Sequence, residues 1–191
     1  MILTVDIGNT ATTMGLYTPE GTLRFRGALK TDKNKTQDQL AIDLLDMFHL
    51  YQADIGEVTG GVISSVVPPM THAMAGAIRQ LSGVRPMIVG PGVKTGMNIL
   101  AEVHNQLGAD IVASSVAALQ KYPQPIIVID MGTATTLSYL GNNTYEGCVI
   151  IPGVRIAVEA LSGRAAELPH ISIEEPPSVF GRSTIDAMRS G

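Results

Sequence analysis

Cysteine is nearly absent from this chain, and long blocks of like charge are absent altogether. The single cysteine, Cys148, excludes an internal disulfide framework. The 13 basic and 17 acidic residues give a net charge of −4, a balance that argues against nucleic acid as the main partner. Residues 1–10 contain neither a basic n-region nor a leader-like cleavage site, so we expect a reducing, cytoplasmic setting.

One stretch lacks Asp, Glu, Lys and Arg entirely. It runs over residues 58–78 and is about as long as a segment that crosses a bilayer. Gly60, Gly61 and the Pro68-Pro69 pair interrupt it, and such residues end or kink a continuous helix. A strand, a turn and a helix explain the stretch better, so we expect no membrane partner.

The first elements read as strands rather than as a strand followed by a helix. Residues 2–5 form a short apolar run that ends at Asp6, and residues 10–29 alternate in polarity around a turn signal at residues 19–21. This pattern predicts antiparallel strands. A Rossmann nucleotide site needs a helix directly after its glycine turn, so that alternative is excluded.

The rest of the first half alternates between helix and strand. We predict strands at residues 58–67 and 86–90, with a helix at residues 70–81 between them. An earlier helix has one apolar face, made of Leu40, Leu44, Met47, Phe48 and Tyr51. Strands followed by alternating helices and strands are typical of an α/β layer architecture.

A further helix is predicted from about Leu107 to Tyr122. Val112, Val116 and Leu119 can share one of its faces, and the prolines that follow it stop the helix. The pattern of the N-terminus then returns: residues 125–129 form an apolar strand that leads to a glycine turn, two more strands and an intervening Gly-Asn-Asn turn.

The two strand-and-turn segments match each other closely. Each consists of an apolar strand, an Asp, an apolar residue, a Gly, a polar residue and a Thr-rich continuation, and Asp6 and Asp130 are 124 residues apart. Such duplication indicates two similar subdomains that open in the same way. We predict an N-terminal subdomain over residues 1–106 and a C-terminal one over residues 107–191.

The chemistry of these turns points to phosphate and a cation. Gly8 and Gly132 lack a Cβ, so backbone N–H groups can approach an anion closely. Carboxylates repel phosphate, so Asp6 and Asp130 are suited to hold a cation. Hydroxyl donors are available from Thr10, Thr133 and Thr135. Either segment alone could be an ordinary Asp-x-Gly turn.

At these residues the chain resembles the actin and sugar-kinase superfamily, in which two related subdomains close on ATP. Further motifs resemble the type III pantothenate kinase family, and they extend over nearly the whole chain. The motifs are DIGNT at 6–10, VGPGVKTG at 89–96, LGAD at 107–110, IDMGTATT at 129–136, PGV at 152–154 and ALSGRAAELP at 160–169.

The resemblance implies an ATP-dependent kinase that converts pantothenate to 4′-phosphopantothenate, the first step toward coenzyme A. It implies a homodimer, Mg²⁺ with the ATP near Asp6, and a monovalent cation, K⁺ or NH₄⁺, at Asp130. The nucleotide contacts that it implies are Asp6, Ile7, Gly8, Asn9, Thr10, Ala11, Thr12, Thr13, Gly132 and Thr133. The substrate contacts that it implies are Ala101, Gly108, Ala109, Asp110, Ile111 and Thr184.

By the same resemblance, Asp110 is the catalytic residue that accepts the proton of the pantothenate hydroxyl. The residue pattern by itself leaves a second interpretation open. Asp110 stands near the start of a predicted helix, where acidic residues are common because the helix dipole favours them.

The chain departs from the family pattern mainly on the substrate side. Ile111 stands where an Arg is usual, Ala101 where a Tyr is usual, and Val103-His104 where Asn-Pro is usual. The family also continues for several more elements, so we expect a C-terminally truncated protein; if this were the whole protein, we would expect weak nucleotide binding.

These departures leave three alternatives open. The first is a related kinase with another hydroxyl substrate. The second is a non-catalytic nucleotide-binding or regulatory protein, and the third is a phosphate hydrolase of the same superfamily.

Overall fold

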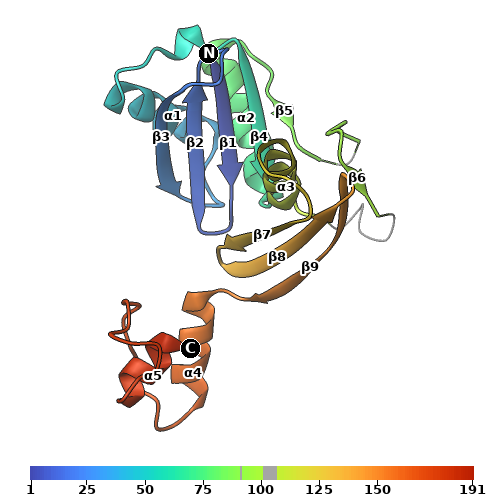
Figure 1. The fold of residues 1–191 in the computed structure, drawn as a ribbon. Helices are drawn as coiled ribbons and strands as arrows, with labels where there is room; N and C mark the ends of the chain where they lie inside the picture. Colours follow the sequence, from blue (N-terminus) through green and yellow to red (C-terminus); the bar gives the residue numbers. More distant parts are fainter. Residues whose placement is uncertain (91, 101–106) are drawn as a thin grey trace. The chain divides into compact units, whose positions relative to one another are not determined.

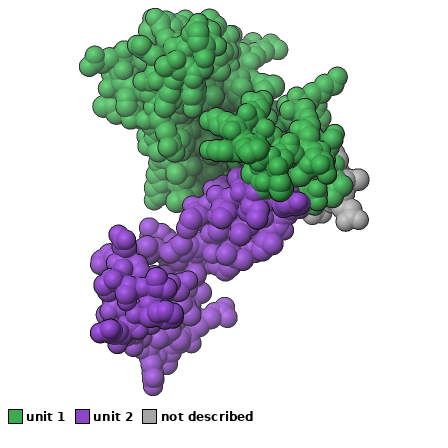
Figure 2. Space-filling view, viewed as in Figure 1, with its two compact units in different colours: residues 1–126, 140–146 green, residues 127–139, 147–191 purple. Residues whose placement is uncertain are grey.

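The computed structural model describes residues 1–90, 92–100 and 107–191. The chain divides into two compact units, coloured separately in Figure 2. Unit 1 comprises residues 1–126 and 140–146, and unit 2 comprises residues 127–139 and 147–191.

Unit 1 contains a five-stranded mixed sheet with the order β3-β2-β1-β4-β5 (Figure 1). Strand β2 pairs antiparallel with both β1 and β3, and β4 pairs parallel with both β1 and β5. The strands are β1 (Ile2–Ile7), β2 (Ala11–Tyr17), β3 (Leu23–Lys30), β4 (Gly60–Ser65) and β5 (Met87–Ile88). The predicted antiparallel strands after the first glycine turn are confirmed, and the missing helix rules out a Rossmann turn.

Two helices of unit 1, α1 (Gln37–Leu50) and α2 (Pro68–Ser82), supply half of the buried side chains in its hydrophobic core. Helix α1 begins with a capping box, in which the Thr36 side chain accepts a bond from Gln39 N–H and the Gln39 side chain accepts one from Thr36 N–H. A short 3-10 helix, η1 (Ile55–Glu57), follows α1. The core side chains that α1 and α2 provide are Leu40, Ala41, Leu44, Met47, Phe48, Met70, Met74, Ala77 and Ile78.

The predicted apolar face of α1 is confirmed except at its last member. Tyr51 lies just past the end of the helix and is 41% exposed. Its ring stacks on Phe25 of β3, with centroids 4.7 Å apart and planes inclined by only 2°. Tyr51 is therefore a stacking residue at the edge of the core, and helical spacing alone could not show that the helix stops one residue earlier.

Helix α3 (Ala109–Lys121) packs against β4 in unit 1. The predicted helix is confirmed. Val112, Val116 and Leu119 are only half-buried. The fully buried positions are instead the small residues Ala109, Ser115 and Ala118. Small side chains let the helix approach the sheet closely, and a search for large apolar residues overlooks them.

A second, four-stranded sheet has the order β6-β9-β8-β7. Its strands are β6 (Asn98–Ile99), β7 (Ile126–Met131), β8 (Ala134–Gly141) and β9 (Thr144–Pro152). Asn142 and Asn143 join β8 to β9 with φ of 50° and 57°. Two successive positive φ angles are typical of a type I′ hairpin turn, which Asn tolerates. The predicted return of strand, glycine turn and hairpin is confirmed.

Unit 2 contains most of β7, most of β8 and the second part of β9, from residue 147 on. It also contains two helices, α4 (Val154–Arg164) and α5 (Thr184–Ser190). None of its hydrophobic side chains belongs to the fully buried set among the described residues. Along β7, the exposed fractions of Ile127, Ile129 and Met131 are 63%, 59% and 71%. The hydrophobic core of the described chain is thus concentrated in unit 1.

The compact units and the predicted subdomains are not the same residue sets, since α3 belongs to unit 1. The subdomain boundary after residue 106 stays a prediction. In the described parts of the chain, no helix is long and apolar enough to span a bilayer.

Candidate phosphate-binding and catalytic site

The first glycine turn joins β1 to β2 in unit 1. Gly8 N–H donates to the Ala11 carbonyl at 3.0 Å, and a Cβ on Gly8 would lie only 3.1 Å from that same oxygen. Glycine therefore permits a tight closure of the turn. Because the Gly8 N–H is used inside the turn, other groups of the turn must contact any bound anion.

Thr31, directly after β3, holds this turn from the side. Its hydroxyl donates to the Gly8 carbonyl at 2.7 Å, and its N–H donates to the Thr10 carbonyl at 3.0 Å. The hydroxyls of Thr31 and Thr12 are also 3.0 Å apart. Sequence reasoning missed Thr31, because nothing in a lone Thr 21 residues beyond Thr10 indicates that the two meet.

The predicted nucleotide contacts of the first turn divide into exposed and buried side chains. Ile7 is fully buried, and Thr12 is 2% exposed with its hydroxyl paired to Thr31. These two side chains therefore shape the turn and are not available to a ligand. Gly8 and Thr13 are partly exposed. The exposed members of the set are Asp6, Asn9, Thr10 and Ala11.

Asp110 lies in the first turn of α3, which begins after Gly108. Its Oδ1 accepts a hydrogen bond from Ile111 N–H at 2.8 Å. A Cβ on Gly108 would collide with the same Oδ1, so glycine at 108 makes room for the carboxylate. The half-buried carboxylate is thus fixed by backbone contacts at the positive end of a helix, where negative charge is stabilised.

Val66 links the first glycine turn to the start of α3 within unit 1. Its N–H donates to the Ile7 carbonyl at 3.0 Å, and its Cγ1 lies 3.6 Å from the Cβ position of Gly108. Two residues before Val66, Ser64 in β4 is the strand-pairing partner of Asp6 in β1. The predicted phosphate turn and the predicted catalytic aspartate are therefore neighbours, although 100 residues separate Thr10 from Asp110.

A cavity of about 510 Å³ opens beside the start of α3. Its wall includes the loop around Lys94 and the residues Leu107, Ala109 and Val112. Lys94 is the only charged side chain among its described lining residues. The volume falls in the range of small-molecule pockets. Of the predicted substrate contacts, Ala109 lines this cavity, whereas Ala101 lies outside the described residues.

The second glycine turn joins β7 to β8 in unit 2. Gly132 N–H donates to the Ala134 carbonyl at 3.0 Å, which closes a turn one residue shorter than the first. Gly153 packs against this turn: its N–H donates to the Thr133 carbonyl at 3.1 Å. A Cβ on Gly153 would lie 2.5 Å from the same oxygen and would overlap the Gly132 carbonyl. Only glycine fits at position 153.

Gly153 is also the N-cap residue of α4, and no side chain caps that helix end. The positive end of α4 therefore lies at the second turn, an arrangement that favours a bound anion. Sequence reasoning noted the PGV motif at residues 152–154 but assigned it no role. Its role here is to let the helix start directly against the turn.

Asp130 stands in β7 and is exposed. Within the described residues its carboxylate has no hydrogen-bond or ion-pair partner, and no cluster of three or more His, Cys, Asp or Glu side chains occurs. Asp6, at the matching position of β1, is likewise exposed. A cation here would be held by one carboxylate, backbone carbonyls, water and phosphate oxygens, which suits Mg²⁺ and similar hard ions.

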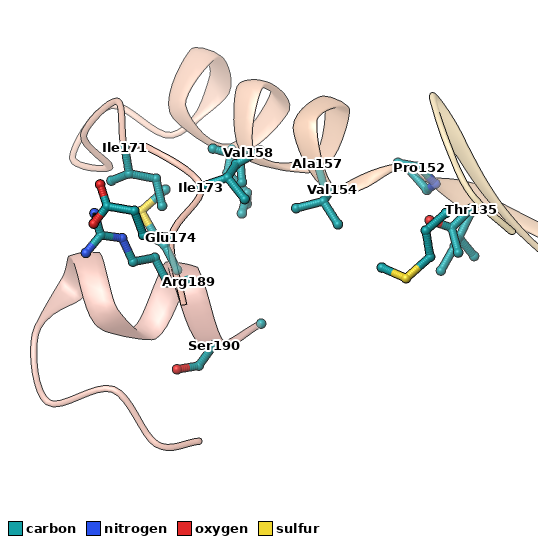
Figure 3. A pocket seen from close by; sticks show the side chains of 15 residues that line it. Thr135, Pro152, Val154, Ala157, Val158, Ile171, Ile173, Glu174, Arg189 and Ser190 are labelled. Carbon is teal, nitrogen blue, oxygen red and sulfur yellow. Dashed lines mark ion pairs between the residues drawn. The ribbon is translucent and has the colours of Figure 1, made fainter. Parts of the chain in front are cut away.

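Unit 2 has its own cavity of about 550 Å³, beginning at the strand that follows the second turn. Figure 3 shows its wall, with Thr135 at one end and side chains of α4 along it. Glu174 and Arg189 form an ion pair of 2.9 Å in the same wall. The cavity is mostly apolar. Of the three threonines predicted as hydroxyl donors to phosphate, Thr135 is among its described lining residues.

Thr184, a predicted substrate contact, is the first residue of α5 in unit 2 and is exposed. The N-cap of α5 is the preceding Ser183, whose hydroxyl accepts from Asp186 N–H at 3.1 Å. Gly108, Ala109 and Asp110 belong to unit 1, whereas Thr184 belongs to unit 2.

Comparisons with known proteins concern the family and the fold of the chain. A type III pantothenate kinase from Listeria welshimeri is 41% identical over the whole chain, which spans 74% of that protein. A Campylobacter jejuni protein assigned to the Baf family of transcriptional activators shares 17% identity, with a TM-score of 0.58 over 98% of this chain and 72% of that one. The ethanolamine utilization protein EutJ of Carboxydothermus hydrogenoformans shares 14%, with a TM-score of 0.50 over 88% and 57%.

The structural likenesses confirm the predicted α/β fold of the actin-like ATPase and sugar-kinase type. The model of the family described as "Type III pantothenate kinase" matches residues 2–191. Together with the identity to the Listeria protein, this match decides the family. The chain belongs to the type III pantothenate kinase family, a family of kinases.

Proposed function

We propose that this protein phosphorylates pantothenate with ATP, giving 4′-phosphopantothenate, the first step of coenzyme A biosynthesis. Membership of the family supports the reaction class. The observation that carries the proposal is the contact through Val66, which brings the first glycine turn and the start of α3 together in unit 1. A phosphate site and a carboxylate base side by side are what phosphoryl transfer to a hydroxyl requires.

In this proposal Asp110 acts on the acceptor. Its carboxylate accepts the proton of the primary hydroxyl while that oxygen forms a bond to the γ-phosphorus of ATP and the bond to the β-phosphate oxygen breaks, releasing ADP. The hydrogen bond from Ile111 N–H and the glycine at 108 hold the carboxylate in one orientation. Because phosphoryl transfer depends on alignment more than on base strength, this fixed orientation is the main contribution of Asp110.

Both glycine turns are proposed to bind phosphate groups of ATP. Asp6 would hold Mg²⁺ through its water shell, and Asp130 would hold K⁺ or NH₄⁺. The exposure of both carboxylates is consistent with these roles. The ions would neutralise phosphate charge, and the turns would position the γ-phosphate. The family resemblance further supports a cytoplasmic homodimer.

The acceptor is proposed to occupy the cavity at the start of α3, which Ala109 lines. Gly108 and Asp110, on either side of Ala109 in the chain, are also proposed to contact it. Ile111, which is half-buried, replaces the Arg expected from the family. This replacement favours one alternative, a related kinase whose acceptor is a different small hydroxy compound. Thr184 and Ala101 remain proposed substrate contacts.

A single assay separates the alternatives. The purified chain is incubated with Mg-ATP and K⁺, with pantothenate, with other small hydroxy compounds or with no acceptor, and ADP release and 4′-phosphopantothenate are measured. Pantothenate-dependent ADP release with formation of the phosphorylated product supports the proposal. Turnover only with another hydroxy compound indicates the related kinase, and turnover with water alone indicates a hydrolase. ATP binding without turnover indicates a non-catalytic protein, and each of these three results refutes the proposal.

A further inference from the structure

The loop between β3 and α1 is anchored to the first glycine turn. Thr31 donates through its N–H to the Thr10 carbonyl at 3.0 Å and through its hydroxyl to the Gly8 carbonyl at 2.7 Å. Two residues further on, the Lys33 ammonium lies 3.4 Å from the Asn9 amide oxygen. The loop therefore places a positive charge at the exposed side of the turn.

Lys33 differs from the next lysine of the same loop. The Lys35 ammonium forms a 2.6 Å ion pair with Asp43, whereas Lys33 has no carboxylate within ion-pair distance among the described residues. Its contact with the neutral amide of Asn9, at 3.4 Å, is at the long end for a hydrogen bond. The charge of Lys33 is thus left without neutralisation in the described structure.

The turn needs such a charge if an anion is to bind there. The N–H of Gly8 and the hydroxyl of Thr12 are already used inside the protein. The nearby carboxylate of Asp6 is exposed and repels phosphate. A lysine at this position offsets that repulsion and offers three donors in place of those the turn has consumed.

We propose that Lys33 is a phosphate-binding residue, which leaves Asn9 and binds the oligophosphate of the nucleotide at the first turn. This inference rests on the proposed function, because it takes the first turn as a nucleotide phosphate site. It adds a cation from a separate loop to a site whose predicted contacts all came from residues 6–13 and 132–133. The lysine acts as a point charge that selects ligands by their phosphate content.

The test compares Lys33→Ala, Lys33→Arg and Lys121→Ala in the full chain. Lys121 is an exposed lysine at the far end of α3, about 18 Å along the helix from Ala109, so its removal changes the net charge equally. Calorimetric titrations with Mg-ATP and with inorganic tripolyphosphate give the dissociation constants, and thermal unfolding confirms that each variant is folded.

We expect Lys33→Ala to weaken the binding of both ligands by roughly tenfold or more, the usual effect of losing a charged hydrogen bond. Lys33→Arg should stay within about threefold of the parent, since it keeps the charge. The loss should shrink as salt concentration rises. Lys121→Ala should leave both constants unchanged.

Equal ATP affinity in the parent and in Lys33→Ala would overturn this inference while leaving the proposed function intact. An equal loss in Lys121→Ala would also overturn it, because net charge alone would then explain the effect. If the parent chain binds neither ATP nor tripolyphosphate, the inference and the proposed function both fail.

Discussion

Replacing Gly153 by alanine tests the second glycine turn most directly. The new Cβ would lie 2.5 Å from the Thr133 carbonyl oxygen and 2.8 Å from its carbon, and it would overlap the Gly132 carbonyl. Cβ atoms essentially never come within 3.0 Å of such atoms, so the turn and the start of α4 must separate. Overpacking of this kind costs about 1–3 kcal/mol, and loss of the Gly153–Thr133 hydrogen bond adds about 1 kcal/mol.

Gly163→Ala, in the same helix, is the matched control. Nothing lies within 4 Å of the Cβ position at Gly163, so the change is sterically free. Alanine is about 1 kcal/mol better than glycine inside a helix, so this variant should be slightly more stable than the parent. The same chemical change is therefore expected to have opposite signs at two positions ten residues apart.

Urea unfolding followed by far-ultraviolet circular dichroism gives the free energy of unfolding for each variant, and calorimetry gives the ATP affinity. We expect Gly153→Ala to lower both and Gly163→Ala to leave ATP affinity unchanged. If Gly153→Ala matches the parent in stability and affinity, the turn tolerates a Cβ, and the reasoning about this contact is wrong.

Three further predictions concern unit 1. Asp110→Asn should lower kcat for pantothenate phosphorylation by about 100-fold or more with unchanged ATP affinity; near-parental kcat would remove Asp110 from catalysis. Asp6→Asn should weaken Mg-ATP binding roughly tenfold in calorimetry, and an unchanged constant would contradict its metal role. The Ser64 hydroxyl is buried without a partner among the described residues, whereas that of Ser65 is bonded. Ser64→Ala should therefore leave thermal stability equal or higher and Ser65→Ala should lower it by about 1 kcal/mol, and the reverse order would refute this account.

The duplicated turns could be predicted because their chemistry is local. A strand followed by Asp, a glycine and threonines carries its own geometry, and both copies form the expected hairpin. The fold class followed from the same elements taken in order. The roles of Asp110 and Asp130 stay predictions.

Other features depend on contacts between distant segments, which no local pattern contains. Thr31 reaches the first turn only after β3 has folded back onto β2. Gly153 meets Thr133 only through the long β8–β9 hairpin. The burial of Ser115 and Ala118 in place of larger neighbours reflects how closely α3 approaches β4, a distance that hydrophobic periodicity does not encode.

The concentration of the hydrophobic core in unit 1 has a consequence for which part of the molecule unfolds first. Local unfolding free energy follows the amount of apolar surface that a segment removes from water, and unit 2 removes little. Amide protons of α4 and α5 should exchange with solvent long before those of β1 and α2. Warming would then disorder the second glycine turn while the first remains intact, so the phosphate contact proposed for the second turn would be lost well below the temperature at which unit 1 unfolds.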